Sequence, residues 1–302
     1  MGLFDIFKKK NTDTAMKAAD TNIVNDNLAE IEAAKRAVKA VMKKTETLCA
    51  RLELTEDKPT LFESKVGGMG YVPHDGIIPE DKMGRQLRLL AQIDCSQAAI
   101  EDFPESGLLQ FWILNDDVYG MSFNDNTCQD TFRIVYHKDI DKTVTEEEVK
   151  AKFKKNEFDD VNSMPVFGEF GVKFTQNTDI MSDYDVRFKK LFCESYNECQ
   201  PPENIGSLND LLIDVADEVP EYEKPNEYAF GHKIGGYPAF TQYDPRVEDT
   251  EHDFLLLQLD SDYGKGNDKI MWGDSGVCGF FINKEKLKNL DFSDVIYNWD
   301  CY

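Results

Sequence analysis

Two aspartates at matching places in the chain could do acid–base or metal chemistry together. Asp94 ends the apolar run LLAQID (89–94), and Asp260 ends LLLQLD (255–260). If a pseudo-twofold arrangement brings these carboxylates close, they can share a proton or hold a metal ion. The alternative is that each aspartate caps a turn of its own. A hydrolase or metal-dependent enzyme using this pair is therefore one functional hypothesis.

A lysine precedes a Gly-Gly pair at two places. KVGGMG begins at Lys65, and KIGGYP begins at Lys233. Glycine-rich backbone beside a lysine can form a small anion-binding nest. Neither segment has the spacing of a phosphate loop or of a dinucleotide-binding loop, so nucleotide binding is not favoured. A turn with positive φ or close chain approach explains the glycines without a ligand.

Two further segments resemble known sites and fall short of them. Residues 260–268, DSDYGKGND, resemble the start of a calcium loop, but the twelfth position, which needs a bidentate glutamate, is Met271. We expect a solvated acidic turn there. The string Gly-Asp-Ser-Gly ends WGDSG (272–276), as around a trypsin-like nucleophile, but none of the four histidines has the matching context. We expect Ser275 to be a turn residue.

The chain repeats three blocks in the same order at an offset of about 168 residues. The blocks pair KVGGMGYVP with KIGGYP, LLAQID with LLLQLD, and FPESGLLQFWI with WGDSGVCGFFI. We infer two copies of one β-rich module. Residues shared by both copies are explained first by the fold, so specific chemistry is expected where the copies differ. The candidate ligand-binding residues combine both groups: Lys65, Gly67, Gly68, Arg85, Arg88, Gln92, Asp94, Lys233, Gly235, Gly236, Arg246, Gln258 and Asp260.

Hydrophobic periodicity divides the chain into three parts. Residues 1–25 are predicted to be a flexible arm, residues 26–58 an amphipathic helix capped at Asn27, and residues 60–302 an α+β domain. Within that domain we expect repeat A at about 60–140, a helical connection at 141–225 and repeat B at about 226–302, packed as one pseudo-symmetric body. The predicted strands include 87–94, 107–114 and 131–137, and the predicted helices are 145–157, 183–199 and 207–218.

Charge is distributed unevenly and restricts the class of partner. The net charge is −23, and residues 1–60 contain eleven Lys/Arg against ten Asp/Glu, so residues 61–302 carry −24. Such a body repels phosphate backbones and anionic lipid, which argues against nucleic-acid and membrane partners. A basic protein or a cation is permitted. The opening MGLFDIFKKK leaves membrane-surface contact as a weak alternative, because Ile6 breaks the myristoylation pattern.

The seven cysteines predict a reducing compartment. They form no Cys-x-x-Cys pair and stand mostly in apolar stretches, so neither a disulfide framework nor a zinc site is indicated. No run is long enough to span a membrane, and no secretory leader is recognised. We therefore expect a cytoplasmic protein.

Several segments resemble those of the YwqG-like family of bacterial proteins. The similar segments are GGMGYVPHDG, LRLLAQID, DDVYGMSF, HKIGGYPAFTQYDPR, LLLQLDSD, IMWGDSGV and DFSDVIYNWDCY. The resemblance runs from about residue 60 to residue 302. It implies an α+β fold with an internal duplication and a domain of unknown function, and it supplies no catalytic residue or cofactor.

Charge and motifs together favour a non-enzymatic binding protein. Its acidic surface and duplicated loops would hold a basic protein partner, such as a toxin that it neutralises. The carboxylate pair Asp94 and Asp260 supports the enzymatic alternative.

Overall fold

The computed structural model describes residues 27–155, 159, 164–246, 251–264 and 266–302. Within these residues the chain forms two compact units. One comprises residues 27–46 and 180–227, and the other comprises residues 47–179 and 228–302. The predicted arm, residues 1–25, lies outside the described residues.

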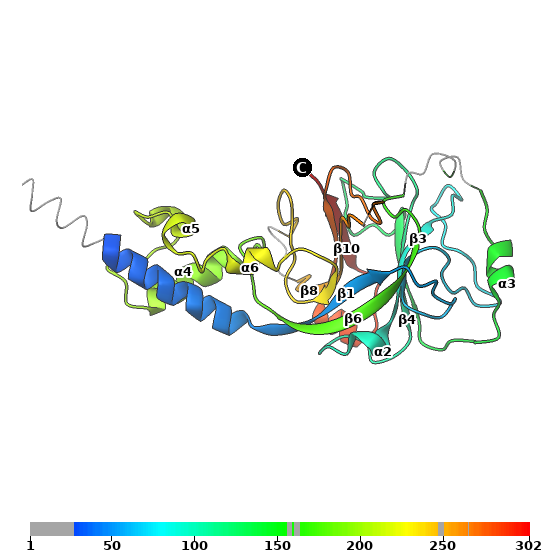
Figure 1. Cartoon of the computed structure of the whole chain (residues 1–302), viewed down its shortest axis with the longest axis horizontal. Helices are drawn as coiled ribbons and strands as arrows, with labels where there is room; N and C mark the ends of the chain where they lie inside the picture. Colours follow the sequence, from blue (N-terminus) through cyan, green and yellow to red (C-terminus); the bar gives the residue numbers. More distant parts are fainter. Residues whose placement is uncertain (1–26, 156–158, 160–163, 247–250, 265) are drawn as a thin grey trace, which may run out of the picture. The chain divides into compact units, whose positions relative to one another are not determined.

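The larger unit contains a ten-stranded antiparallel sheet (Figure 1). The strand order is β10-β9-β8-β7-β1-β6-β2-β3-β4-β5. The strands are β1 (Thr47–Thr55), β2 (Lys65–Gly67), β3 (Arg88–Asp94), β4 (Leu108–Ile113), β5 (Phe132–His137), β6 (Glu169–Asp179), β7 (Lys233–Gly235), β8 (Phe254–Asp260), β9 (Val277–Ile282) and β10 (Val295–Asp300). Three short helices belong to the same unit: α2 (Cys95–Ala98), α3 (Glu146–Ala151) and α7 (Lys284–Lys288). The fold is α+β, as predicted.

The strands on the two sides of the central pair, β1 and β6, follow one another in the same way. Beyond β1 lie β7, β8, β9 and β10, and beyond β6 lie β2, β3, β4 and β5. The strands at matching places have equal lengths: three residues in β2 and β7, seven in β3 and β8, and six in the four outer strands. A register shift interrupts β3 after Leu89 and β8 after Leu255.

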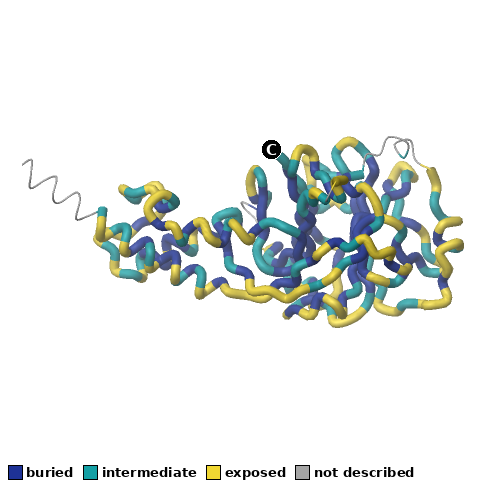
Figure 2. The backbone as a smooth tube through the Cα atoms, in the orientation of Figure 1, coloured by how far each residue is buried: buried dark blue, intermediate teal, exposed yellow. Residues whose placement is uncertain are grey.

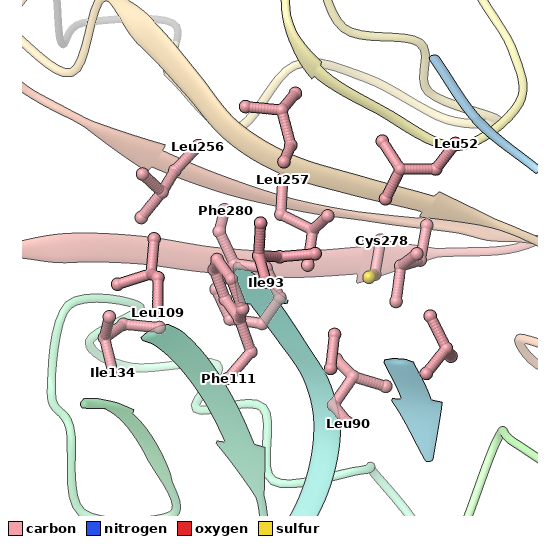
Figure 3. Packing of buried hydrophobic residues seen from close by; sticks show 14 of the residues in the cluster. Leu52, Leu90, Ile93, Leu109, Phe111, Ile134, Leu256, Leu257, Cys278 and Phe280 are labelled. Atoms are coloured by element: carbon pink, nitrogen blue, oxygen red, sulfur yellow. The ribbon is translucent and has the colours of Figure 1, made fainter. Parts of the chain in front are cut away.

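The sheet curls until its two ends face each other across one core. Phe111 of β4 and Phe280 of β9 have ring centroids 4.9 Å apart, although these strands lie near opposite ends of the strand order. Phe132 of β5 and Tyr297 of β10 are 5.3 Å apart. Figure 3 shows Phe111 and Phe280 meeting among leucines and isoleucines from both halves. Burial of such side chains stabilises the fold by about 1.5–3 kcal/mol each.

Strands β4 and β9 are buried at every residue. Leu109 and Phe111 of β4 enter the core between the two halves, while Leu108 and Trp112 pack into a second cluster on the other face of the strand. The second cluster also contains Val149 of α3. Continuous hydrophobic runs such as LLQFWI are typical of strands covered on both faces, and Figure 2 shows this burial in dark blue.

The smaller unit is helical. Residues 27–45 form a helix, and α4 (Phe188–Glu198) bonds to it through the ammonium group of Lys44, 2.7 Å from Glu198. The ring of Phe188 meets that of Tyr222 edge-on at 5.4 Å. The unit also contains the 3₁₀ helix η2 (Leu208–Asp210), α5 (Val215–Glu218) and α6 (Lys224–Glu227).

The structure differs from the sequence-based prediction after residue 45. The helix predicted to run to residue 58 gives way to β1, the strand paired with both β6 and β7. The three-residue spacing of Cys49 and Leu52 is compatible with a helix. The alternation of Ala50, Leu52 and Leu54 is equally compatible with a half-buried strand. In the structure these three residues form the buried face of β1. Tertiary pairing therefore decides between two patterns that the sequence allows. The segment predicted as a helical connection, residues 141–225, also contains strand β6. The helices predicted at 145–157 and 183–199 correspond to the shorter α3 and α4, and the one predicted at 207–218 is divided into η2 and α5.

Candidate functional site

Gln92, in the middle of β3, holds a neighbouring loop. Its Oε1 accepts a hydrogen bond from the backbone N–H of Tyr71 at 2.8 Å. Its Nε2 donates to the carbonyl oxygens of Leu61 at 3.0 Å and Glu63 at 2.9 Å. The side chain is fully buried. It therefore satisfies three backbone groups that would otherwise lack partners.

Gln258, in β8, is bonded in the same way. Its Oε1 accepts from the backbone N–H of Ala239 at 2.8 Å, and its Nε2 donates to the carbonyls of Ala229 at 3.0 Å and Gly231 at 2.9 Å. This side chain is also buried. Both glutamines thus hold loops in place, and ligand binding at either one stays a prediction.

Lys65 and Lys233 are buried, and each pairs with a carboxylate of β6. Lys65 Nζ lies 2.8 Å from Glu169 Oε1, and Lys233 Nζ lies 2.8 Å from Asp179 Oδ2. Burial lowers the pKa of Lys233, and the negative charge of Asp179 opposes that shift. The ammonium groups predicted to form anion nests therefore face carboxylates of the chain itself.

The glycines after these lysines allow the carboxylates to approach. Gly68 and Gly236 have φ angles of +71° and +70°. A Cβ at Gly68 would strike the side chain of Glu169, and one at Gly236 would strike that of Asp179. The preceding glycines, Gly67 and Gly235, also have positive φ. The Gly-Gly pairs therefore give the chain the shape that each ion pair needs.

Asp94 and Asp260 each accept hydrogen bonds from nearby backbone. Asp94 Oδ1 accepts from the backbone N–H of Ser96 at 3.1 Å and caps α2. Asp260 accepts from the N–H groups of Gly231 and Ser261, both at 2.8 Å, and burial raises its pKa. The enzymatic alternative needs these two carboxylates to work together, and that arrangement stays a prediction.

Arg85 and Arg88, which lie where the two predicted copies differ in sequence, make ion pairs within the chain. Arg85 Nε lies 2.7 Å from Asp81, and Arg88 Nε donates to Asp159 at 3.1 Å. The guanidinium of Arg88 also lies over the ring of Phe153, 5.7 Å from its centroid.

Arg246 is held in the same manner, at a more buried place. Its guanidinium lies 2.6 Å from Asp244 Oδ2 and 4.4 Å from the ring centroid of Phe281. Arginine between a carboxylate and an aromatic face is therefore a recurrent arrangement in this chain.

The acidic segment 260–268 lies beside a histidine. The backbone N–H of Asp260 donates to His232 Nδ1 at 3.0 Å, and His232 Nε2 lies 3.5 Å from Asp262 Oδ2. This interaction lowers the pKa of Asp262.

A cavity of about 760 Å³ adjoins the segment and includes Lys269 in its lining. No group of three or more His, Cys, Asp or Glu residues in the described chain is arranged to hold a metal ion. Residue 265 lies outside the described residues.

Ser275 lies in a turn with φ +84°. Its Oγ is hydrogen-bonded to the phenolic oxygen of Tyr263. The sequence-based interpretation of Ser275 as a turn residue agrees with this placement.

A cleft of about 590 Å³ is formed by three segments that sequence reasoning did not connect. They are the loop 121–127 between β4 and β5, the loop around 242–245, and the end of β10. The lining residues are Met121, Ser122, Phe123, Asn124, Asp125, Asn126, Thr127, Gln242, Tyr243, Pro245, Asn298, Trp299, Asp300 and Cys301. This set is called the aromatic–acidic cleft below.

Asp300, at the end of β10, anchors one wall of the cleft. Its Oδ1 accepts from the backbone N–H and hydroxyl of Thr241 at 3.1 and 3.0 Å, and its Oδ2 accepts from the N–H of Gln242 at 3.0 Å. Gln242 in turn donates to the carbonyl of Cys301 at 2.7 Å. The bonds to the Asp300 carboxylate are part-buried and charge-assisted, and they fix the loop to the strand.

The opposite wall is fixed to the edge of β10. The N–H of Tyr297 donates to the carbonyl of Asn126 at 2.9 Å, and Trp299 Nε1 donates to that of Val118 at 2.8 Å. Within the loop, Asp125 Oδ1 accepts from the N–H and hydroxyl of Thr127 at 3.1 and 2.7 Å. The bonds from Thr127 lower the pKa of Asp125, so its carboxylate is ionised near neutral pH.

The cleft combines exposed aromatic rings with acidic and amide groups. Phe123 is 77% exposed and Tyr243 is 68% exposed, while Trp299 is half-buried. The lining contains two aspartates and four amide side chains, with no lysine, arginine or histidine among the residues named above. Its chemistry suits a cationic or hydrogen-bonding ligand rather than an anion.

One sequence signal could have indicated the cleft. The strings SFNDNT (122–127) and TQYDP (241–245) each place an aromatic residue inside a polar turn. Aromatic residues in such turns have little chance of reaching a core, so they are candidates for binding.

The described chain is an α+β protein with a cleft on the surface of its larger unit. The model of one family, described as "Domain of unknown function (DUF1963)", matches residues 64–301, and the chain belongs to that family. The predicted resemblance to YwqG-like proteins is confirmed by this match. No curated protein matches the chain. Every helix in the described residues is too short or too polar to serve as a membrane span.

Proposed function

We propose that this chain is a non-enzymatic binding protein whose partner is a basic protein. The observation that carries the proposal is the aromatic–acidic cleft, where exposed Phe123 and Tyr243 accompany the ionised Asp125 in a lining without cationic residues. Aromatic residues are enriched at protein interfaces because they combine large apolar area with few rotatable bonds. Acidic neighbours select for a basic partner.

The charge of the body supports the same class of partner. Residues 61–302 carry −24, and a field of that sign attracts basic proteins and accelerates their association. A basic toxin that the chain neutralises is one such partner. The action is proposed to be cytoplasmic, because all seven cysteines are free thiols in the structure.

We further propose that the sheet consists of two copies of one module. The matching strand lengths and the equivalent bonds of Gln92 and Gln258 support this proposal. Duplication leaves each copy free to diverge in its loops. The loop 241–245 of the second copy contributes to the cleft, whereas its counterpart, at 73–77 by the offset, holds Lys152 Nζ on the carbonyls of Pro73 and Gly76.

The proposal is tested by affinity capture on the immobilised full chain at low salt, followed by titration of the purified captured protein. We expect a partner with a basic isoelectric point and an affinity that falls steeply as salt rises, because exposed charges are screened over about 8–10 Å. A specific partner that is neutral or acidic, or whose binding ignores salt, would overturn the proposal.

A further inference from the structure

We propose that the aromatic–acidic cleft accepts an arginine side chain from an extended basic segment of the partner. This inference rests on the proposed function and specifies where and how the basic partner is recognised. The cleft's volume of about 590 Å³ exceeds that of one guanidinium group, so neighbouring residues of the segment also fit.

The charge of the cleft selects a cation. Asp125 is exposed and ionised, and its Oδ1 accepts the two bonds from Thr127, so its negative charge lies in the solvent-accessible lining of the cleft. Asp300 adds negative electrostatic potential to the cleft but is not expected to bond the ligand directly. Both of its oxygens already accept bonds, from Thr241 and Gln242. An anionic ligand would meet two carboxylates and no compensating cation in the lining.

The aromatic rings favour arginine over lysine. Phe123 and Tyr243 expose most of their surface, and a guanidinium can stack on such faces while it bonds to a carboxylate. An ammonium group is more strongly hydrated and offers no plane to stack.

Two arginines among the described residues already have this arrangement. Arg246 lies between Asp244 and the ring of Phe281, and Arg88 lies between Asp159 and the ring of Phe153. In the cleft, the carboxylate and the aromatic faces are present and the arginine would come from the partner.

Amide groups complete the recognition of a peptide. The lining includes Asn124, Asn126, Gln242 and Asn298, whose side chains offer both donors and acceptors. Such groups can bond the backbone of an extended segment on either side of the arginine.

The experiment measures binding of fluorescently labelled hexa-arginine, hexa-lysine and hexa-serine peptides to the full chain by anisotropy. For the wild-type protein we expect hexa-arginine to bind several-fold tighter than hexa-lysine, and hexa-serine not to bind. The variants Phe123→Ala and Tyr243→Ala should each weaken hexa-arginine binding about 3- to 10-fold. The matched control is Tyr228→Ala, which removes an exposed aromatic outside the cleft lining and should leave binding unchanged.

One result would contradict binding in the cleft, and another would contradict the proposed function itself. If hexa-arginine binds in a salt-dependent way and both cleft variants bind like the control, the cleft is not the site, although the acidic body still binds basic segments. If hexa-arginine binds no better than hexa-serine at low salt, the proposed function itself fails. Urea midpoints equal to wild type establish that the variants are folded, which is expected because both side chains are exposed.

Discussion

Gln92 and Gln258 each accept a hydrogen bond from one backbone N–H and donate two to backbone carbonyls, at distances that agree within 0.1 Å. They occupy strands β3 and β8, which stand at matching places on either side of the centre of the sheet. Each side chain fixes the loop that carries its Gly-Gly pair. The two glutamines therefore have the same structural effect at two places.

Replacing either glutamine by leucine is expected to destabilise the protein by at least about 3 kcal/mol. Gln92→Leu and Gln258→Leu keep most of the side-chain volume, but each leaves one backbone N–H and two backbone carbonyls without partners. Each unsatisfied buried group lowers the free energy of unfolding by about 1–3 kcal/mol. Urea denaturation measures the loss. The control Gln176→Leu removes a single solvent-exposed hydrogen bond from β6, to the carbonyl of Ala99, and should change stability by less than about 1 kcal/mol. Gln92 Oε1 also accepts a bond from Gln110 Nε2 at 2.8 Å, so Gln92→Leu should lose at least as much stability as Gln258→Leu. A loss like that of the control for either variant would contradict the assigned bonds.

A chain truncated to residues 60–302 should fail to fold cooperatively. It retains the whole family match but lacks β1, which pairs with β6 from Thr47 to Thr55 and also with β7. Without β1, two central strands would expose unpaired backbone groups. Circular dichroism during thermal unfolding measures the effect, and a cooperative transition like that of the full chain would show that β1 is dispensable.

His137 is expected to make stability fall as the pH falls below about 6.5. Burial lowers its pKa, so the unfolded chain binds the proton more readily than the folded protein does. The neutral form is favoured in the fold, and its contribution is lost as the pH decreases from about 6.5 towards the lowered pKa. The variant His137→Gln should therefore lose less stability than wild type between pH 7.5 and pH 5 in urea denaturation.

His74 is expected to change stability with pH in the opposite direction to His137. Its hydrogen bond with Glu148 raises its pKa, so the protonated ring is favoured in the folded state. That contribution is complete below about 6.5 and is lost as the pH rises through the raised pKa. His74→Gln should thus reduce stability more at pH 5 than at pH 8. Equal losses at both pH values would contradict the assigned interaction.

Local patterns in the sequence predicted much of the fold. The strands at 87–94 and 107–114, the α+β class and the capped helix at Thr145 all rest on residues near one another in the chain, and each has a counterpart in the structure. Strand β1 was missed because its apolar residues satisfy both a helical and a strand period. Only pairing with β6 and β7 decides between them.

The cleft could not be assembled from sequence because its walls meet through the curling of the sheet. Phe123 follows β4, Tyr243 follows β7, and Trp299 lies in β10, so more than a hundred residues separate the first from the second. By contrast, Lys65 and Lys233 attracted notice as motif residues, and the structure places both in buried ion pairs with β6. Motif residues here position loops, and loops outside the repeated blocks contribute most of the cleft lining.

The most direct test of the account compares hexa-arginine binding to Asp125→Asn and Asp139→Asn. Each variant removes one negative charge from an exposed residue, but only Asp125 lines the cleft. If the cleft recognises arginine, Asp125→Asn should raise the Kd for hexa-arginine about 3- to 5-fold, and Asp139→Asn should change it less than about 2-fold. Equal weakening by both variants would mean that binding follows net charge alone and would contradict recognition in the cleft.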